Sequence, residues 1–272
     1  MRILFVGDIM GRAGREALEK YLPKLKNDLR TDVIIINGEN AAHGRGITGK
    51  HCQQFYDLGA DCITTGNHVW DQREIIAYIA RDPKLLRPAN FPQNAPGQGA
   101  SLITAQNGQK ILVVNLMARL YMDPLDDPFQ AMENILIDYK LGQNCDAIFV
   151  DFHGEATSEK MAFAHAFDGR ISGTIGTHTH VPTADAHVLP GGTAYMSDAG
   201  MTGDYDSVIG IRKDLSVQRF KTKMPGDHFI PASENMTLCG ALIVTDDNTG
   251  KAKQIAPVRV GDTLANTIPT EI

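Results

Sequence analysis

Short apolar segments that alternate with helix-like stretches constrain this chain more than any other feature of its sequence. Strands are predicted at Ile3–Val6, Val33–Ile36 and Asp61–Thr64. The stretches that follow these strands are predicted to be helices, over Arg15–Leu29, Lys50–Leu58 and Asp71–Ala80, the last with Asp71 as its N-cap. Because strands and helices alternate, we expect the first half of the chain to form a parallel sheet with right-handed crossovers.

The second half of the chain has more strands that follow one another directly. A Gln106-Asn107-Gly108 turn separates two of them, and a turn over residues 246–250 separates two more. The predicted strands are Ser101–Ala105, Ile111–Asn115, Ala147–Asp151, Ile171–Ile175, Met236–Val244 and Ala252–Val260. This mixture favours an α/β (α+β) fold with two sheets rather than one. We expect a single domain over residues 1–272, because no segment has the composition of a linker.

Composition excludes several classes of protein. The 272 residues are 43% hydrophobic and 21% charged, which is ordinary for a globular protein and unlike a fibrous or disordered chain. The net charge of -6 argues against a protein built to grip nucleic-acid backbones. No segment approaches the roughly 20 apolar residues that span a bilayer, so we expect no membrane partner and a cytoplasmic address. The cysteines form no C-x-x-C pair and are expected to be small buried residues.

Polar residues follow five of the predicted strands. In parallel sheets the carboxyl ends of the strands are where ligands bind, so these five segments are expected to converge on one crevice. The segments are Asp8, Asn37-Gly38-Glu39-Asn40, Thr65-Gly66-Asn67-His68, Asp151-Phe152-His153-Gly154 and Gly176-Thr177-His178-Thr179-His180.

The side chains of these segments form a coherent set of metal ligands. Carboxylates, amide oxygens and imidazoles without thiolates suit manganese, iron, zinc or cobalt better than calcium or magnesium. The candidates are Asp8, Glu39, Asn40, Asn67, His153, His178 and His180. Taken singly, an Asp after a strand is usually a turn residue and a lone His is usually structural. Their conjunction at strand ends favours a metal centre, in which His178 and His180 face one metal from a strand or diverge toward two from a tight loop.

The same segments resemble a known family. The order Gly7-Asp8, Gly38-Glu39-Asn40, Gly66-Asn67-His68, His153-Gly154 and Gly176-Thr177-His178-Thr179-His180 resembles the calcineurin-like metallophosphoesterase superfamily, and within it the YmdB-like branch. Further patterns of that branch are present over residues 115–119, 151–160 and 201–210. The resemblance extends over nearly the whole chain.

The resemblance implies a four-layer α-β-β-α sandwich of two mixed sheets flanked by helices, with a two-metal centre. By analogy, Asp8, Glu39, Asn40 and His180 hold the first metal, and Glu39, Asn67, His153 and His178 hold the second. Glu39 bridges the two metals, and His68 is a general acid outside them. The superfamily's usual Asp-x-His motif is here Asp8-Ile9-Met10, so Met10 is expected to pack rather than bind metal. Iron and manganese are the leading metals, and zinc is the alternative.

The implied activity is hydrolysis of a phosphodiester. Two cations roughly 3.5–4 Å apart stabilise both the attacking and the leaving oxygen, and a hydroxide between them would be the nucleophile. His68 would protonate the leaving oxygen. A small phosphodiester is expected as the substrate, with 2′,3′-cyclic or 3′,5′-cyclic nucleotides as candidates, rather than an extended nucleic-acid duplex. Arg45, Arg119 and Lys160 could each meet a phosphate or simply be solvated.

Two other functions stay open at this point. The same centre could serve a phosphomonoesterase or protein phosphatase, which a panel of mono- and diesters would distinguish. Alternatively, the chain could be a metal-binding regulatory protein with vestigial turnover, because the histidine of the Asp-x-His motif is absent. The sequence leaves the oligomeric state open as well, and a homo-oligomer is compatible with it.

Overall fold

Side chains of the central strands alternate between two hydrophobic layers. In β1 (Arg2–Val6), Ile3 and Phe5 face a second sheet, whereas Leu4 and Val6 pack against helices. This alternation is why both faces of the strand are apolar. The structure is a computed structural model that describes residues 1–224 and 230–269.

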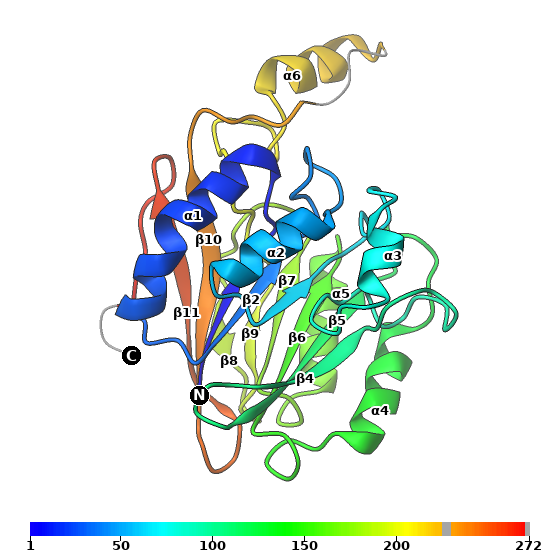
Figure 1. Cartoon of the computed structure of the whole chain (residues 1–272), viewed down its shortest axis with the longest axis vertical. Coiled ribbons are helices and arrows are strands. Elements are labelled where there is room, and N and C mark those ends of the chain that lie inside the picture. The colour runs from blue at the N-terminus through cyan, green and yellow to red at the C-terminus, as the bar shows by residue number, and fades with distance from the viewer. Residues whose placement is uncertain (225–229, 270–272) are drawn as a thin grey trace.

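The first sheet carries the N-terminal strands and the C-terminal hairpin. Its strand order is β11-β10-β1-β2-β3, in which β1, β2 and β3 are parallel and β10 is antiparallel to β1 (Figure 1). The other strands of this sheet are β2 (Val33–Asn37), β3 (Cys62–Thr64), β10 (Thr237–Thr245) and β11 (Ala252–Gly261). The predicted C-terminal hairpin is therefore confirmed.

The second sheet is built from the middle of the chain, in the order β4-β5-β6-β7-β9-β8. Its central strands are parallel, and the strands at its two edges, β4 and β8, are antiparallel to their neighbours. The strands are β4 (Ala100–Thr104), β5 (Lys110–Met117), β6 (Ala147–His153), β7 (Gly173–Thr177), β8 (His187–Val188) and β9 (Ala194–Met196).

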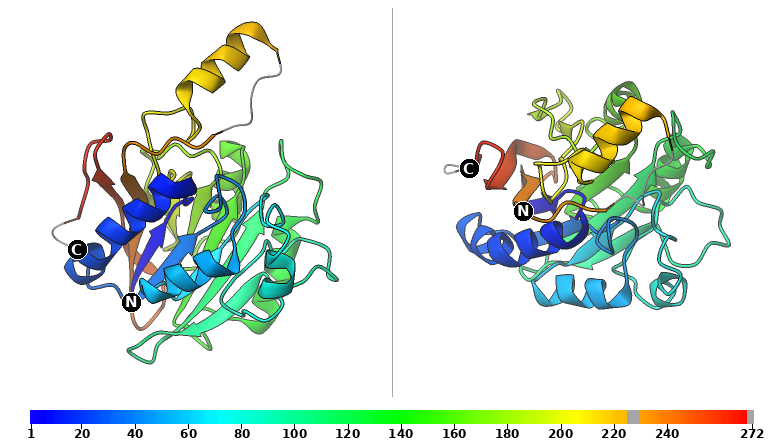
Figure 2. Two further views of the ribbon diagram at one scale, coloured as in Figure 1. Left: turned by 45° about the horizontal axis from the view of Figure 1, so that its top comes forward. Right: turned by 90° about the horizontal axis from the view of Figure 1, so that it is seen from above.

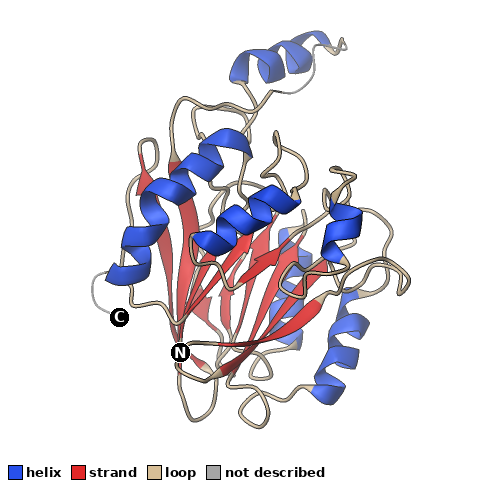
Figure 3. Ribbon diagram, viewed as in Figure 1, coloured by secondary structure: helices blue, strands red, loops and turns tan. Residues whose placement is uncertain are grey.

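Helices cover the outer faces of both sheets (Figure 3). The first sheet packs on α1 (Gly11–Asp28), α2 (Gly49–Asp57) and α3 (Ile75–Ile79), and the second on α4 (Pro128–Asp138) and α5 (Thr157–Ala166). A third apolar cluster, which includes the contact between the Phe5 and Phe149 rings, fills the space between the sheets. The four-layer α-β-β-α arrangement of two mixed sheets is therefore confirmed.

The helix α6 (Lys213–Thr222) differs from the others because it packs on neither sheet. It projects beyond the carboxyl ends of the parallel strands (Figures 1 and 2). Ser216 is the buried residue of this helix, whereas Val217 and Phe220 are exposed. None of the helices in the described part of the chain is long and apolar enough to cross a membrane.

Several predicted boundaries were wrong. The helix α1 begins at Gly11, four residues earlier than expected, and continues past Pro23 to Asp28. Asp71 caps no helix, since its carboxylate lies 3.0 Å from His68 Nδ1 and α3 begins only at Ile75. Five elements were not predicted from the sequence, namely α4, α5, α6, β8 and β9, of which β8 and β9 are only two and three residues long.

Candidate metal centre

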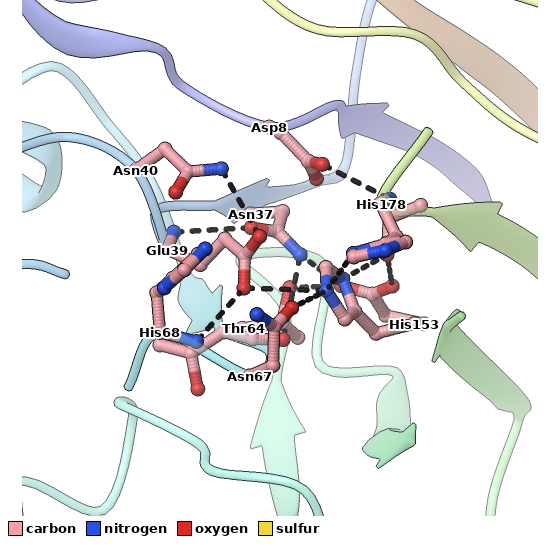
Figure 4. A network of polar contacts seen from close by, with 12 residues as sticks. Asp8, Asn37, Glu39, Asn40, Thr64, Asn67, His68, His153 and His178 are labelled. Carbon is pink, nitrogen blue, oxygen red and sulfur yellow. Dashed lines mark hydrogen bonds and ion pairs between the residues drawn. The ribbon is translucent and has the colours of Figure 1, made fainter. Parts of the chain in front are cut away.

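The five polar segments converge between the two sheets, at the carboxyl ends of the parallel strands (Figure 4). From the first sheet come Asp8 after β1, Glu39 after β2 and Asn67 after β3. From the second sheet come His153, the last residue of β6, and His178, which directly follows β7. Residues as far as 170 positions apart in the sequence are thereby in contact, since the amide of His178 donates a hydrogen bond to Asp8 Oδ2.

One group of ligand atoms surrounds His153 Nε2. Asn67 Oδ1 lies 2.8 Å from this nitrogen, His178 Nδ1 lies 3.1 Å from it, and Glu39 Oε2 lies 3.3 Å from it. The imidazoles of His153 and His178 meet edge to face. Glu39, His153 and His178 together form a set whose ligand atoms all lie within 4.8 Å of one another, which is a geometry that can hold a cation.

A second group surrounds His180 Nε2 and shares Glu39. Asp8 Oδ2 lies 3.4 Å from His180 Nε2, and the Asn40 side-chain nitrogen lies 3.0 Å from it. The same Asn40 nitrogen donates a hydrogen bond to Glu39 Oε1. Asp8, Glu39 and His180 form the second set of ligand atoms within 4.8 Å of one another. The Glu39 carboxylate therefore belongs to both sets, as a bridging ligand must.

The outer ring nitrogens of the three histidines each have an acceptor. His153 Nδ1 lies 2.9 Å from Thr177 Oγ1, His178 Nε2 lies 3.3 Å from Glu155 Oε2, and His180 Nδ1 lies 2.8 Å from the carbonyl oxygen of Ile209. An imidazole that donates its outer N–H in this way presents the lone pair of its inner nitrogen to the centre, as metal-binding histidines do.

The centre contains several buried carboxylates close to one another. Burial, with the nearby carboxylates of Glu39, Asp198 and Asp151, raises the pKa of Asp8 well above its usual value. Burial likewise raises the pKa of Glu39 to about 8. Among the described residues, the buried atoms Asp8 Oδ1 and Asn40 Oδ1 have no hydrogen-bond partner. Cations would satisfy both the carboxylates and these oxygens, so the donor set fits a metal centre.

The histidines are held neutral, which is the form that binds metal. Burial lowers the pKa of His153 well below its usual value, and the neighbouring His178 lowers it further. Burial also lowers the pKa of His178 to about 4 and lowers that of His180. At neutral pH the three imidazoles are therefore available as uncharged ligands.

His68 lies beside this centre but belongs to neither set of ligand atoms. Its Nδ1 is 3.0 Å from Asp71 Oδ2, and its side chain is partly exposed. The residue lines a cavity of about 290 Å³ together with Glu39, Asn40, His178 and His180. With Nδ1 turned to Asp71, the other ring nitrogen, Nε2, is the one left for a ligand in the cavity.

The structure also shows where the other residues discussed from the sequence lie. Met10 is buried, as expected of a packing residue. The prediction that Lys160 meets a phosphate or solvent was wrong, because its ammonium is buried between the Thr177 carbonyl and Asp198. Arg119 is exposed and paired with Asp127, whereas Arg45 lines the cavity. The cysteines are buried and unpaired, as predicted.

Four further histidines lie apart from the two sets of ligand atoms. His43, His165 and His187 are exposed, and His51 is partly exposed at the start of α2. His228 lies outside the described residues.

The sequence did not indicate the hydrogen-bonded residues that support the ligands from the side away from the centre. The Thr177 hydroxyl donates to Asp151 Oδ1, and Asp151 Oδ2 accepts hydrogen bonds from Thr64 Oγ1 and the Asn37 side chain. Burial raises the pKa of Asp151 to about 6. A buried Asp two residues before a candidate ligand was the available signal, since strand alternation places Asp151 and His153 on the same face of β6.

Comparison with known proteins identifies the family. A family model described as YmdB-like protein matches residues 4–258. The chain belongs to the YmdB-like family. A 2′,3′-cyclic-nucleotide 2′-phosphodiesterase from Bacillus subtilis is 47% identical over 96% of this chain and 98% of its own length.

Solved structures agree with this membership. A structure described as a novel phosphatase from Mycoplasma pneumoniae has a TM-score of 0.88 and 34% identity, over 96% of this chain and 93% of that one. A calcineurin-like phosphoesterase from Bacillus subtilis has a TM-score of 0.54 and 13% identity, over 95% of this chain and 90% of that one. The latter likeness extends to the fold alone, and it places this YmdB-like chain in the calcineurin-like architecture.

Proposed function

We propose that this YmdB-like chain is a metal-dependent phosphodiesterase that hydrolyses small phosphodiesters, with 2′,3′-cyclic nucleotides as the leading substrates. The observation that carries the proposal is the position of Glu39, whose carboxylate is shared by two sets of ligand atoms beside the cavity that His68 lines. The Bacillus subtilis relative, which is named for hydrolysis of 2′,3′-cyclic nucleotides, supports this choice of substrate.

The residues that would hold the metals follow from the two sets. Asp8, Asn40 and His180 would hold one cation, Asn67, His153 and His178 would hold the other, and Glu39 would bind both. When bound, such a pair of cations supplies Lewis acidity toward the phosphoryl oxygens and lowers the pKa of water. We propose iron or manganese, with zinc as the alternative, because the ligand atoms are carboxylate and amide oxygens and imidazole nitrogens.

His68 is the proposed proton donor. In hydrolysis of the cyclic diester a P–O bond to the ribose breaks, a P–O bond to water forms, and the released ribose oxygen must gain a proton. His68 lines the cavity, and Asp71 accepts a hydrogen bond from Nδ1 and orients the imidazole, which leaves Nε2 as the nitrogen that can donate this proton. The proton that water loses passes to solvent, and His68 takes up a proton from solvent before the next turnover.

Arg45 is the proposed contact for the anionic phosphate. Its side chain is exposed and lines the cavity, and no carboxylate of the described residues pairs with it. Its position is fixed through the backbone, because the Gln72 side chain donates a hydrogen bond to the Arg45 carbonyl at 2.8 Å. An unpaired cation at the rim of a site is suited to attract a monoanionic substrate.

The decisive test separates proton donation from metal binding. We expect His68→Ala to retain metal, measured by elemental analysis, and to lose roughly 10²–10⁴-fold in kcat on 2′,3′-cyclic AMP. The loss should be smaller on bis-p-nitrophenyl phosphate, whose leaving group needs no proton. His165→Ala, at an exposed histidine of α5, is the matched control. A native rate of His68→Ala on the cyclic nucleotide would remove His68 from this role.

A second experiment addresses the phosphatase alternative, which the description of the Mycoplasma pneumoniae structure keeps open. The purified chain is assayed with matched mono- and diesters of the same nucleoside. We expect turnover of the 2′,3′-cyclic diester to exceed turnover of the 2′- and 3′-monoesters. The opposite order would favour a phosphomonoesterase on the same centre.

A further inference from the structure

We propose that the side chains of Phe220 and Ile209 form the binding surface for the nucleobase, so that the enzyme selects nucleotides by their base as well as by their phosphate. This inference rests on the proposed phosphodiesterase function and adds a specificity site to it. The proposed occupant is the base of a mononucleotide whose cyclic phosphate lies at the metal centre.

The residues that line the cavity beside the metal centre are of two chemical kinds. The polar and charged ones include Glu39, Asn40, His68, His178, His180 and Arg45. The apolar ones are Met10, Val208, Ile209, Ile211 and Phe220. A nucleotide needs both kinds of contact, because its phosphate is anionic and the faces of its base are apolar and aromatic.

The size of the cavity favours a mononucleotide. Its volume is about 290 Å³, just below the range of roughly 300–1,000 Å³ found for small-molecule sites. A longer oligonucleotide would need an extended groove lined with cations, whereas Arg45 is the one arginine or lysine among the described residues that line this cavity. The size and charge of the cavity therefore suit a mononucleotide better than a longer oligonucleotide.

Phe220 is the aromatic side chain of the cavity. It lies on α6, the helix that projects beyond the strand ends (Figure 2), and its side chain is 70% exposed although it lines the cavity. A large aromatic side chain exposed to this degree contributes little to the stability of the fold. Aromatic side chains in such positions are the usual platforms on which bases stack.

Ile209 supplies a second, independent observation. Val208 and Ile211 are joined by two backbone hydrogen bonds, and the two residues between them, Ile209 and Gly210, both have positive φ angles, 49° and 90°. Turns of this kind favour Asn-Gly, and a β-branched residue is strongly disfavoured at the first central position. Ile209 is nevertheless 54% exposed, so packing within the protein does not explain it.

The same turn is tied to the metal centre. The carbonyl oxygen of Ile209 accepts a hydrogen bond from His180 Nδ1 at 2.8 Å, and this contact holds the turn in place. A strained, exposed apolar residue that is fixed to a candidate metal ligand and lines the cavity indicates a functional role for its side chain. Contact with the apolar face of a base provides that role.

The test compares two substrates that differ only in the base. These are 2′,3′-cyclic AMP and the 2′,3′-cyclic phosphate of methyl riboside, which has the same ring phosphate and no base. We expect the wild type to have a lower KM for the nucleotide. Phe220→Ala should raise the KM for 2′,3′-cyclic AMP and leave the KM for the riboside unchanged. The ratio of the riboside KM to the nucleotide KM should therefore fall about tenfold, the size of effect that loss of one base–aromatic stack produces. Phe220→Trp should preserve the ratio, because it keeps an aromatic face.

The matched control is Val217→Ala, which removes an exposed apolar side chain from the same helix without touching the cavity lining. It should leave both KM values unchanged. If Phe220→Ala changes neither KM, or changes both equally, base binding at this surface is overturned while the phosphodiesterase activity stands. If the wild type hydrolyses neither substrate, the proposed function itself fails, and the specificity site fails with it.

Discussion

At the scale of single residues, Gly66 shows how closely the ligands are packed. A Cβ atom added at this position would lie 2.2 Å from Glu39 Oε2 and 2.4 Å from His153 Nε2. Both distances are far shorter than the closest approach of non-bonded side-chain atoms. Glu39 Oε2 and His153 Nε2 are also atoms that would bind metal. The glycine is therefore required by the space between the ligands rather than by an unusual backbone angle.

We expect Gly66→Ala to fold but to bind metal poorly, because its methyl group displaces Glu39 or His153 from the centre. Metal content should fall below half of the wild-type value, and phosphodiesterase turnover should fall at least as far. Elemental analysis and far-UV circular dichroism on the same sample measure the two properties. Full metal content in a folded Gly66→Ala protein would contradict this account of the ligand positions.

At the scale of one element, the loop after β7 carries two of the histidines in an unusual backbone conformation. His178 and His180 have φ angles of 100° and 66°, a region that residues other than glycine rarely occupy. Asp198 Oδ2 accepts a hydrogen bond from the Thr179 amide at 3.0 Å and a second from Lys160 Nζ at 3.0 Å.

Lys160 and Asp198 form a buried ion pair that fixes this loop. Lys160 Nζ also donates to the carbonyl of Thr177 at 2.8 Å, so the lysine holds both sides of the turn. The two side chains are each 1% exposed, and a buried pair of this kind is costly to break by removing one partner. The strain at the two histidines is therefore maintained by the surrounding structure.

We expect Lys160→Met to lower the free energy of unfolding by about 3–5 kcal/mol, because it leaves the Asp198 carboxylate buried without a cation. Denaturant unfolding measures the loss. The double variant Lys160→Met/Asp198→Asn should recover a large part of it, since no charge is then left unpaired. Equal stability of the single variant and the wild type would show that the ion pair is not what holds the loop.

At the scale of the whole molecule, the candidate metal centre lies between the two sheets and draws ligands from both. Asp8, Glu39 and Asn67 come from the first sheet, and His153 and His178 from the second. Bound cations would join the carboxyl ends of the two sheets, in addition to the hydrogen bonds from Asn37 and Thr64 to Asp151 and the apolar layer farther along the strands. Metal binding should therefore stabilise the fold as well as serve catalysis.

We expect removal of metal by EDTA to lower Tm by several degrees and re-addition of manganese or iron to restore it. A ligand that binds only the folded state stabilises it by about 2.7 kcal/mol at a free concentration one hundred times its Kd. Differential scanning calorimetry measures the shift. Glu39→Ala, which removes the shared carboxylate, should show little response to added metal. An equal shift in that variant would place the stabilising metal elsewhere.

Local patterns in the sequence were enough to predict the parallel strands and the polar residues at their ends. Val33–Asn37 forms a buried strand, and its first four residues are all β-branched. Glu39 comes two residues after this strand, so the strand places it near the carboxyl edge of the sheet. Local patterns of this kind depend on neighbouring residues alone. The order of the motifs, through resemblance to a known family, also indicated the layers of the fold and its activity.

The contacts behind and around the ligands could not be predicted from local patterns. Lys160 is a solvated or phosphate-binding residue by sequence, but the fold buries it against Asp198. Phe220 and Ile209 carry no signal in the sequence, because their position at the cavity depends on where α6 and its preceding turn cross the strand ends. Such contacts join segments distant along the chain, and their geometry is set by the packing of two sheets rather than by any local preference.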